Sequence, residues 1–158
     1  MNVDVSSENE MMQFGRCLAD AMGGRGCVHI SGELGAGKTT LCRGMLRAMG
    51  HIGAVKSPTF TLVEPYQVPG ALVYHFDLYR LSDPNELDYI GIEEYFGEGK
   101  LCLIEWPERG QGILPDPDLW KRLSVSGDGR KALVSAATAV GVGLQARLAA
   151  IPLSSVRG

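Results

Sequence analysis

One short stretch limits the possible folds of this chain more than any other feature. It reads Gly-Glu-Leu-Gly-Ala-Gly-Lys-Thr over residues 32–39 and fits the pattern G-x-x-x-x-G-K-[ST] of a phosphate-binding P-loop. Glycines let the backbone curl so that successive N–H groups point inward, and the N-terminus of a following helix adds positive potential. Lys38 can then reach the β- and γ-phosphates, and the Thr39 hydroxyl can bind a magnesium ion. The stretch therefore predicts a site for a nucleoside triphosphate.

The sequence on either side of this loop supports the prediction. Residues 27–30, Cys-Val-His-Ile, form an apolar run that is typical of a buried strand. Residues 39–49 have the apolar spacing of a helix, which we expect to end at Gly50. A glycine-rich turn that fitted the pattern by chance would not need a strand before it and a helix after it.

Helices and strands alternate along the rest of the chain. Ser7 and Glu10 have the spacing of a capping box, and apolar residues follow at helical intervals to about residue 22. A second such box, at residues 83–86, begins a short helix that we expect to end near residue 91. The other predicted elements are a helical turn at 92–96, strands at 61–64, 71–76, 101–104, 119–126 and 131–136, and a final helix at 142–150.

These elements predict an α/β fold with a mixed parallel and antiparallel sheet. Pro69-Gly70 and Gly127-Asp128-Gly129 separate strand pairs at hairpin spacing, whereas the strands near the P-loop alternate with helices. A chain of 158 residues fits one domain with a hydrophobic core. We therefore expect a single P-loop NTPase-like domain over residues 1–158, in which helices flank the sheet and residues 152–158 form a frayed tail.

Charge and cysteine content limit the partners and the compartment. The formal net charge of −3 argues against unaided binding to nucleic acid, which needs a basic face. An RNA-related role would therefore require a partner that holds the RNA. None of the four cysteines forms a C-x-x-C pair, which indicates buried reduced thiols rather than a metal or disulfide framework. Because the N-terminus lacks a signal-peptide pattern and no apolar run is long enough to span a bilayer, we expect a cytoplasmic protein.

Two acidic residues end predicted strands and could complete the site. A P-loop enzyme needs a carboxylate at a neighbouring strand end to hold magnesium or to polarise water. Asp77 follows the run 72–76, and Glu105 follows the purely apolar run 101–104. Aspartate is the commoner magnesium partner, but the second run is the more typical central strand, so the spacing does not rank the two acids. His75 lies between two aromatic residues, which favours a packed histidine over a catalyst.

Several short motifs follow one another in an order that is specific to one family. They read Gly-Glu-Leu-Gly-Ala-Gly-Lys-Thr-Thr at 32–40, Ser-Pro-Thr-Phe at 57–60, His-Phe-Asp-Leu-Tyr-Arg at 75–80 and Ile-Glu-Trp-Pro at 104–107. Together with Gly-Ile-Glu-Glu-Tyr-Phe at 91–96, they closely resemble the TsaE family. These are bacterial P-loop ATPases of the pathway that makes N6-threonylcarbamoyladenosine (t6A) in tRNA. The resemblance runs from about Ser7 to Leu119.

The resemblance implies chemical roles for individual residues. Thr39 and Glu105 would be the magnesium ligands, so that Glu105 would take the part of the acid on the neighbouring strand. Asp77 would be the other essential acid, placed to orient water or the γ-phosphate. Lys38 would contact the phosphates. The implied catalytic set is therefore Asp77, Lys38 and Glu105.

The resemblance also implies which residues contact the nucleotide. Residues 57–60 would form a switch-like segment that senses the γ-phosphate, and adenine contacts would lie partly near residues 7–11. Trp106 would lie close to the nucleotide and to a partner surface. The implied nucleotide-binding residues are Glu33, Leu34, Gly35, Ala36, Gly37, Lys38, Thr39, Thr40, Ser57, Thr59 and Trp106.

A protein of this family would work as an ATPase subunit with partner proteins. It would bind ATP and Mg²⁺, dock on the TsaD–TsaB pair and hydrolyse ATP to support multiple turnovers of that complex. It would meet tRNA only through the complex and would not contact a membrane. Hydrolysis would depend on the partners.

Three alternatives share the P-loop. A small-molecule kinase should carry an arginine-rich lid, but the arginines here are scattered along the chain. A GTP-binding module should carry the tetrapeptide Asn-Lys-x-Asp, which the sequence lacks. A nucleotide-binding adaptor that does not hydrolyse ATP remains open.

Overall fold

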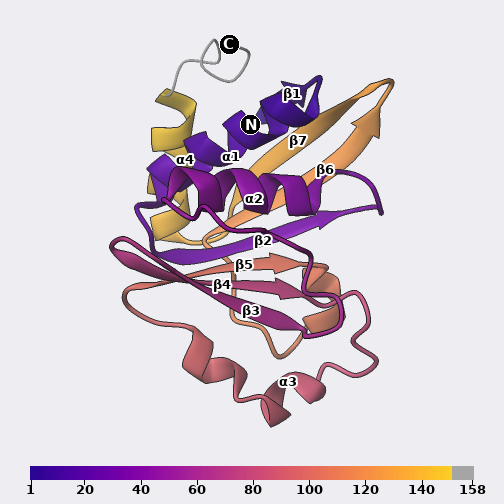
Figure 1. Cartoon of the computed structure of the whole chain (residues 1–158), viewed down its shortest axis with the longest axis vertical. Coiled ribbons are helices and arrows are strands. Elements are labelled where there is room, and N and C mark those ends of the chain that lie inside the picture. The colour runs from indigo at the N-terminus through magenta and orange to yellow at the C-terminus, as the bar shows by residue number, and fades with distance from the viewer. Residues whose placement is uncertain (151–158) are drawn as a thin grey trace.

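The computed structural model describes residues 1–150 and contains one seven-stranded mixed sheet with helices on both faces (Figure 1). The strand order is β1-β7-β6-β2-β5-β4-β3. The central strands β6, β2, β5 and β4 run parallel to one another, whereas each of the outer pairs β1–β7, β7–β6 and β3–β4 is antiparallel. The strands are β1 (Asn2–Val5), β2 (Gly26–Gly32), β3 (Val63–Val68), β4 (Ala71–Asp77), β5 (Lys100–Glu105), β6 (Leu119–Ser126) and β7 (Gly129–Ala136). The helices are α1 (Glu8–Met22), α2 (Lys38–Ala48), α3 (Glu86–Tyr89) and α4 (Ala139–Ala150), with short 3-10 turns at Ile92–Tyr95 and Pro107–Gly110.

The predicted fold class, a single α/β domain with a mixed sheet, is confirmed. The Ser7 hydroxyl accepts a hydrogen bond of 3.1 Å from the backbone N–H of Glu10 and begins α1. Gly23 ends the helix with a φ of 65°. Both predicted hairpins, β3–β4 and β6–β7, pair as expected.

The two ends of the sheet differ in detail from the prediction. The sequence did not predict β1, in which Val3 and Val5 alternate with polar residues over only four positions. Its partner β7 lies at the other end of the chain, so no local signal supports the pairing. At the opposite edge β3 begins at Val63 rather than at residue 61, because Leu62 has a φ of 73°, which is incompatible with a strand.

The C-terminal helix α4 begins earlier than its predicted start at residue 142. The Thr138 hydroxyl accepts a hydrogen bond of 3.0 Å from the N–H of Gly141 and caps a helix that starts at Ala139. The predicted frayed tail, residues 152–158, lies outside the described residues. Within residues 1–150, no helix combines the length and the apolar character that crossing a membrane requires.

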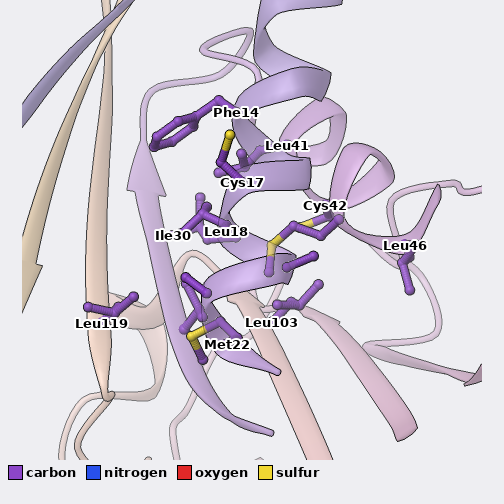
Figure 2. Packing of buried hydrophobic residues seen from close by; sticks show 14 of the residues in the cluster. Phe14, Cys17, Leu18, Met22, Ile30, Leu41, Cys42, Leu46, Leu103 and Leu119 are labelled. Atoms are coloured by element: carbon purple, nitrogen blue, oxygen red, sulfur yellow. The ribbon is translucent and has the colours of Figure 1, made fainter. Parts of the chain in front are cut away.

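The larger core lies between the sheet and the helices α1, α2 and α4. Figure 2 shows Leu18 of α1 and Leu41 of α2 packed over Ile30 of β2 and Leu103 of β5. All four side chains are fully buried. This packing fixes α2 over β2, which leads into the phosphate loop, and over β5, which lies next to β2.

Helices α1 and α2 meet backbone to backbone. A Cβ on Gly44 would lie 2.4 Å from the carbonyl oxygen of Met12, and a Cβ on Gly15 would lie 2.6 Å from the carbonyl oxygen of Leu41. Only glycine fits at both positions, because real Cβ atoms do not approach oxygen so closely. The close crossing holds α2 tightly, and α2 carries Lys38 and Thr39 in its first turn.

The opposite face of the sheet is covered by α3 and the turn at Ile92–Tyr95. Leu87 and Ile92 pack there against Phe76 of β4 and Ile104 of β5. Side chains of β5 alternate between the two faces, so Glu105, like Leu103, points to the side of α2. The alternation of side chains along β5 thus places the carboxylate of Glu105 on the face of the sheet that α2 covers.

Candidate nucleotide-binding site

The P-loop connects β2 to α2 with a tightly curled backbone. Gly35 and Gly37 have φ values of 80° and 100°, which glycine adopts without the steric cost that other residues have. At Gly32 a Cβ would lie 2.5 Å from the carbonyl oxygen of Leu123 in β6, so the loop begins in close contact with the neighbouring strand. The curled segment leads directly into the N-terminus of α2, the arrangement that binds phosphate.

Lys38 lies over the loop. Its Nζ donates hydrogen bonds of 2.6 and 2.8 Å to the carbonyl oxygens of Gly32 and Glu33 and stands 4.4 Å above the ring of Trp106. Burial lowers the pKa of Lys38, and the negative charge of Glu105 is the largest of several that oppose this shift. The side chain therefore holds an ammonium group beside the glycines of the loop.

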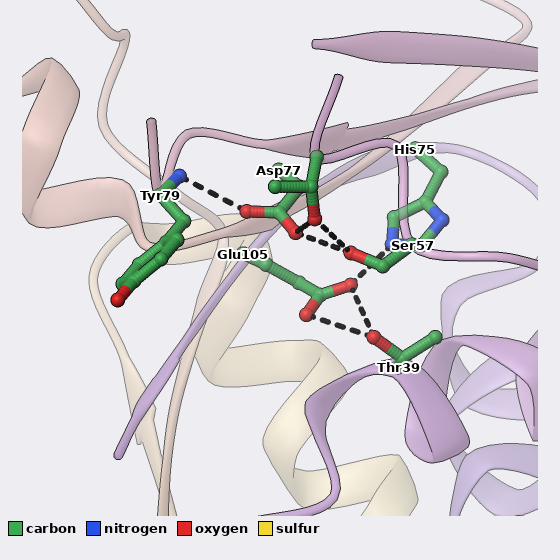
Figure 3. Close-up of polar contacts among 7 residues, drawn as sticks. Thr39, Ser57, His75, Asp77, Tyr79 and Glu105 are labelled. Atoms are coloured by element: carbon green, nitrogen blue, oxygen red, sulfur yellow. Dashed lines mark hydrogen bonds and ion pairs between the residues drawn. The ribbon is translucent and has the colours of Figure 1, made fainter. Parts of the chain in front are cut away.

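Two buried carboxylates end the adjacent strands. Asp77 and Glu105 are partners in the parallel register of β4 and β5 and are only 4% and 2% exposed. Because β5 lies next to β2, Glu105 is the acid that reaches α2. Its two carboxylate oxygens each accept the Thr39 hydroxyl at 3.1 Å (Figure 3).

Asp77 has a different set of partners. Its Oδ2 accepts hydrogen bonds from the hydroxyls of Ser57 and Thr59, the latter at 2.8 Å. Its Oδ1 accepts the backbone N–H of Tyr79 at 3.0 Å (Figure 3). The acid thus ties residues 57–59 to the end of β4, and the sheet presents two carboxylates with separate contacts.

His75 is fully buried behind these acids. Its Nε2 lies 2.5 Å from Oε2 of Glu105, and its Nδ1 has no hydrogen-bond partner among the described residues. The histidine does not line the cleft at this site. It is packed, as the sequence predicts, and it also fixes the carboxylate of Glu105.

Two aromatic rings close one side of the site. Trp106 directly follows Glu105 and has a φ of 59°, a conformation that costs a residue with a side chain about 1–2 kcal/mol. Its ring lies 4.9 Å from the ring of Tyr79. The left-handed turn at Trp106 brings its indole to Lys38.

A cleft of about 380 Å³ brings together most residues that the sequence predicts for the site. It adds Tyr79, which the prediction leaves out although it lies two residues after Asp77 in the same motif. Ala36 is fully buried and Glu33 is exposed, and neither side chain lines the cleft. The predicted residues that line it are Leu34, Gly35, Gly37, Lys38, Thr39, Thr40, Ser57, Thr59, Asp77, Glu105 and Trp106.

A second cleft, of about 270 Å³, lies on the other side of the loop and shares Gly35, Gly37 and Thr40 with the first. Met11 forms part of its wall, with its side chain 3.0 Å from the position of a Cβ on Gly37. Arg130, which the sequence did not predict for the site, lines this cleft and donates a hydrogen bond of 3.0 Å to the carbonyl oxygen of Gly35. The β6–β7 hairpin that carries Arg130 reaches the loop only because β6 pairs with β2. No local sequence signal could therefore have placed Arg130 at this site.

The donor set fits a triphosphate with a hard divalent cation. Magnesium prefers oxygen ligands, and a P-loop hydroxyl and a strand-end carboxylate are the ones that such sites provide. Thr39 and Glu105 already converge on one point. The glycine backbone and Lys38 lie beside them, and the second cleft adjoins the first at the loop.

A curled glycine loop between a parallel strand and a helix, beside buried carboxylates on the next strands, defines a P-loop nucleotide-binding protein. Comparison with known proteins gives the particular family. A family model described as "Threonylcarbamoyl adenosine biosynthesis protein TsaE" matches residues 5–132, and the chain belongs to the TsaE family.

Individual relatives agree with this assignment. A Haemophilus influenzae protein named tRNA threonylcarbamoyladenosine biosynthesis protein TsaE is 47% identical over 142 residues, which cover 87% of this chain and 90% of the relative. The Bacillus subtilis protein of the same name is 37% identical over 112 residues, or 71% of this chain and 68% of the relative. The crystal structure of Bacillus subtilis YdiB superimposes with a TM-score of 0.80 at 25% identity, over 94% of this chain and 93% of that one. The predicted family is therefore confirmed.

Proposed function

We propose that this chain is a Mg²⁺-dependent ATPase subunit of the machinery that forms t6A in tRNA. One observation carries the proposal: the P-loop threonine is hydrogen-bonded to a buried strand-end glutamate, and a second buried acid stands beside it in register. Such a pair of acids exceeds what simple nucleotide binding needs. The names of the relatives supply the pathway.

Binding of the phosphates rests on the loop and its lysine. The N–H groups of residues 32–39 and the N-terminus of α2 receive the phosphate oxygens. Lys38 exchanges its contacts with the carbonyl oxygens of Gly32 and Glu33 for phosphate contacts. Thr39 and Glu105 would hold a magnesium ion, which would supply positive charge to neutralise the phosphates. His75 keeps the carboxylate of Glu105 in position.

Asp77 is the residue that we assign to water. Its carboxylate lines the cleft and is oriented by the hydroxyls of Ser57 and Thr59. From this position it can accept a proton or orient a water molecule toward the γ-phosphate. Ser57 and Thr59 make the segment 57–60 responsive to phosphate, because any contact they form with it competes with their hydrogen bonds to Asp77.

The second cleft is suited to the nucleoside. It joins the first cleft at Gly35, Gly37 and Thr40, so a base placed there leaves the phosphates on the P-loop. Met11 offers an apolar surface on which a base can pack, and Arg130 offers a cation at the rim. ATP is the nucleotide that we propose, in line with the family.

We expect the protein to act through partners. The net charge of −3 does not favour direct binding to tRNA, so we propose that TsaD and TsaB hold the tRNA and that this subunit resets the complex between turnovers. The four cysteines are free and buried, which agrees with a reducing compartment such as the cytoplasm.

Reconstitution with TsaD and TsaB tests the proposal. We expect that the chain raises multiple-turnover t6A formation and that the complex hydrolyses ATP. Lys38→Ala should abolish both effects, because the phosphates lose their cation. The absence of any effect of the wild-type chain on either reaction would refute the assignment, and t6A formation that proceeds equally with Lys38→Ala would instead indicate an adaptor that needs no hydrolysis.

A further inference from the structure

Three buried donor groups from three different elements converge behind the proposed magnesium site. They are Cys42 of α2, His75 of β4 and Glu105 of β5, and one ligand atom from each lies within 4.8 Å of those of the other two. Their exposed fractions are 0%, 0% and 2%. Figure 3 shows the carboxylate of Glu105 between His75 and Thr39, and Figure 2 shows Cys42 on the side of α2 that faces the sheet.

The chemistry of this set differs from that of a magnesium site. Thiolate sulfur, imidazole nitrogen and carboxylate oxygen are the donors of Zn²⁺ and similar transition-metal ions, whereas Mg²⁺ binds oxygen. We propose that Cys42, His75 and Glu105 form a binding site for a divalent transition-metal ion, with Zn²⁺ as the best fit. The fourth ligand is a water molecule on the side of the cleft.

The two ring nitrogens of His75 have different surroundings. One ring nitrogen contacts Glu105, and the other has no hydrogen-bond partner within residues 1–150. A buried polar atom without a partner costs free energy. Coordination through Nε2 would replace the hydrogen bond to Glu105 by two metal–ligand bonds and would leave Nδ1 as it is.

The distances require only small movements. Bond lengths of about 2.0–2.3 Å around a tetrahedral zinc ion separate its ligand atoms by roughly 3.3–3.7 Å. The observed 2.5 Å between Nε2 of His75 and Oε2 of Glu105 must widen by about 1 Å, and the thiol must approach by a similar amount. Both are side-chain adjustments. Binding forms a zinc–sulfur bond, and the thiol proton leaves to water.

The ion has a route through the nucleotide cleft. Thr39 and Glu105 line this cleft, and Cys42 lies three residues after Thr39 on the same side of α2. The metal site is therefore one helical turn deeper than the proposed magnesium site and shares Glu105 with it. Glu105 cannot bind zinc in this way and keep both contacts with Thr39.

This arrangement makes zinc an inhibitor of the nucleotide site, a consequence that rests on the proposed function. When zinc draws Glu105 away from Thr39, the site loses a magnesium ligand. Removal of Cys42 should release the inhibition, because zinc would then have only His75 and Glu105 as protein ligands and would bind weakly. The metal site itself does not depend on whether the protein hydrolyses ATP.

Cobalt titration of the full-length, metal-free chain tests the site directly. Co²⁺ bound through a thiolate has an intense ultraviolet charge-transfer band and visible bands of tetrahedral geometry, and Zn²⁺ should displace it. Cys42→Ser should lose the charge-transfer band and weaken binding at least about 100-fold, more than the loss of an outer-sphere partner. Cys102→Ser is the matched control, because Cys102 is equally buried but packs on the opposite face of the sheet. A wild-type chain without the band, or a band that persists in Cys42→Ser, would overturn the proposal.

Two further measurements keep the proposal testable if Cys42→Ser folds poorly. X-ray absorption of the wild-type chain loaded with zinc should show one sulfur ligand among nitrogen and oxygen ligands, and a shell without sulfur would contradict the site. ATP hydrolysis in the presence of TsaD and TsaB should fall when zinc is added to the wild type, and it should be at least about tenfold less sensitive in Cys42→Ser. Cobalt binding without zinc inhibition would leave the metal site standing and would instead refute the role of Glu105 in hydrolysis.

Discussion

Lys121 of β6 is a buried cation under helix α1. It is 0% exposed, and its Nζ has no hydrogen-bond partner among residues 1–150. The Nζ lies 5.4 Å from the centroid of the Phe14 ring, a cation–π contact. Burial lowers the pKa of Lys121 to about 7, so near neutral pH the folded chain holds this amine partly uncharged.

The first prediction concerns stability against pH. Because the pKa of Lys121 is about 7 in the folded chain and 10.5 in the reference state, the unfolded chain binds more protons between these values. Its contribution to the free energy of unfolding therefore rises with pH across that window, by up to about 1.4 kcal/mol per pH unit. Lys121→Met should remove this slope and stabilise the fold at pH 7. Urea denaturation of both proteins at pH 6, 8 and 10 measures the difference, and parallel profiles would contradict the burial of an unpaired amine.

Asp77 and Glu105 are two buried acids with different hydrogen-bond partners. Glu105 has a helix hydroxyl and a histidine as partners, whereas Asp77 has two hydroxyls of a loop and one backbone N–H. The first set suits a metal ligand that must stay fixed. The second suits an acid whose surroundings can change with the ligand.

The second prediction follows from this difference. Asp77→Asn keeps the shape of the side chain but removes its charge and proton affinity. We expect ATP hydrolysis with TsaD and TsaB to fall at least about 100-fold, while nucleotide affinity changes little. Single-turnover hydrolysis and equilibrium binding of a fluorescent ATP analogue measure the two quantities. Asp88→Asn, at an exposed position of α3, is the control, and equal hydrolysis in the two variants would remove Asp77 from the mechanism.

At the scale of elements, the crossing of α1 and α2 sets the position of the P-loop helix. Gly15 and Gly44 leave no room for a Cβ at this crossing. The helix α2 is therefore held by backbone contact and by the leucines of the core. This rigid support is what keeps Thr39 opposite Glu105.

The third prediction tests that support by comparing two glycines that both lie in helices. Gly44→Ala should destabilise the fold by about 1–3 kcal/mol, because its Cβ would lie 2.4 Å from the Met12 carbonyl oxygen and the helices must separate. Gly143→Ala in α4 meets no atom within 4 Å and should stabilise by about 0.5–1 kcal/mol, since alanine favours helix. Chemical denaturation followed by circular dichroism gives both values. Equal effects of the two changes would mean that the helix crossing is not tight.

At the scale of the whole molecule, the two clefts beside the P-loop join segments that are distant in the sequence. The cleft beside the acids draws on β4, β5 and the P-loop, and the second cleft draws on the N-terminal segment and the β6–β7 turn. A ligand in both clefts would therefore connect most of the sheet. Its binding energy should add to the stability of the entire fold.

The fourth prediction follows from this connection. A non-hydrolysable ATP analogue with Mg²⁺, at about 100 times its dissociation constant, should raise the free energy of unfolding by about 2.7 kcal/mol. For a domain of this size that corresponds to a rise in midpoint of roughly 5–10 °C. Differential scanning fluorimetry measures the shift. Lys38→Ala should show little or none at the same concentration, and an equal shift in that variant would place the ligand elsewhere.

The sequence by itself determined the local parts of this protein. The P-loop, the Ser7 cap, the two hairpins and the strand ends at Asp77 and Glu105 were all readable, because each depends on residues a few positions apart. The family followed from the order of the motifs. For β1 the local signal was too short, since its stability comes from pairing with β7.

Only the tertiary structure decided how these parts meet. The strand order β2-β5-β4 brings Glu105 to Thr39 and leaves Asp77 to Ser57, a ranking that spacing could not give. The same register places His75 behind Glu105, and helix packing adds Cys42. The physical reason is that parallel pairing and helix crossing join segments tens of residues apart, whereas sequence patterns report only which face a residue takes within its own element.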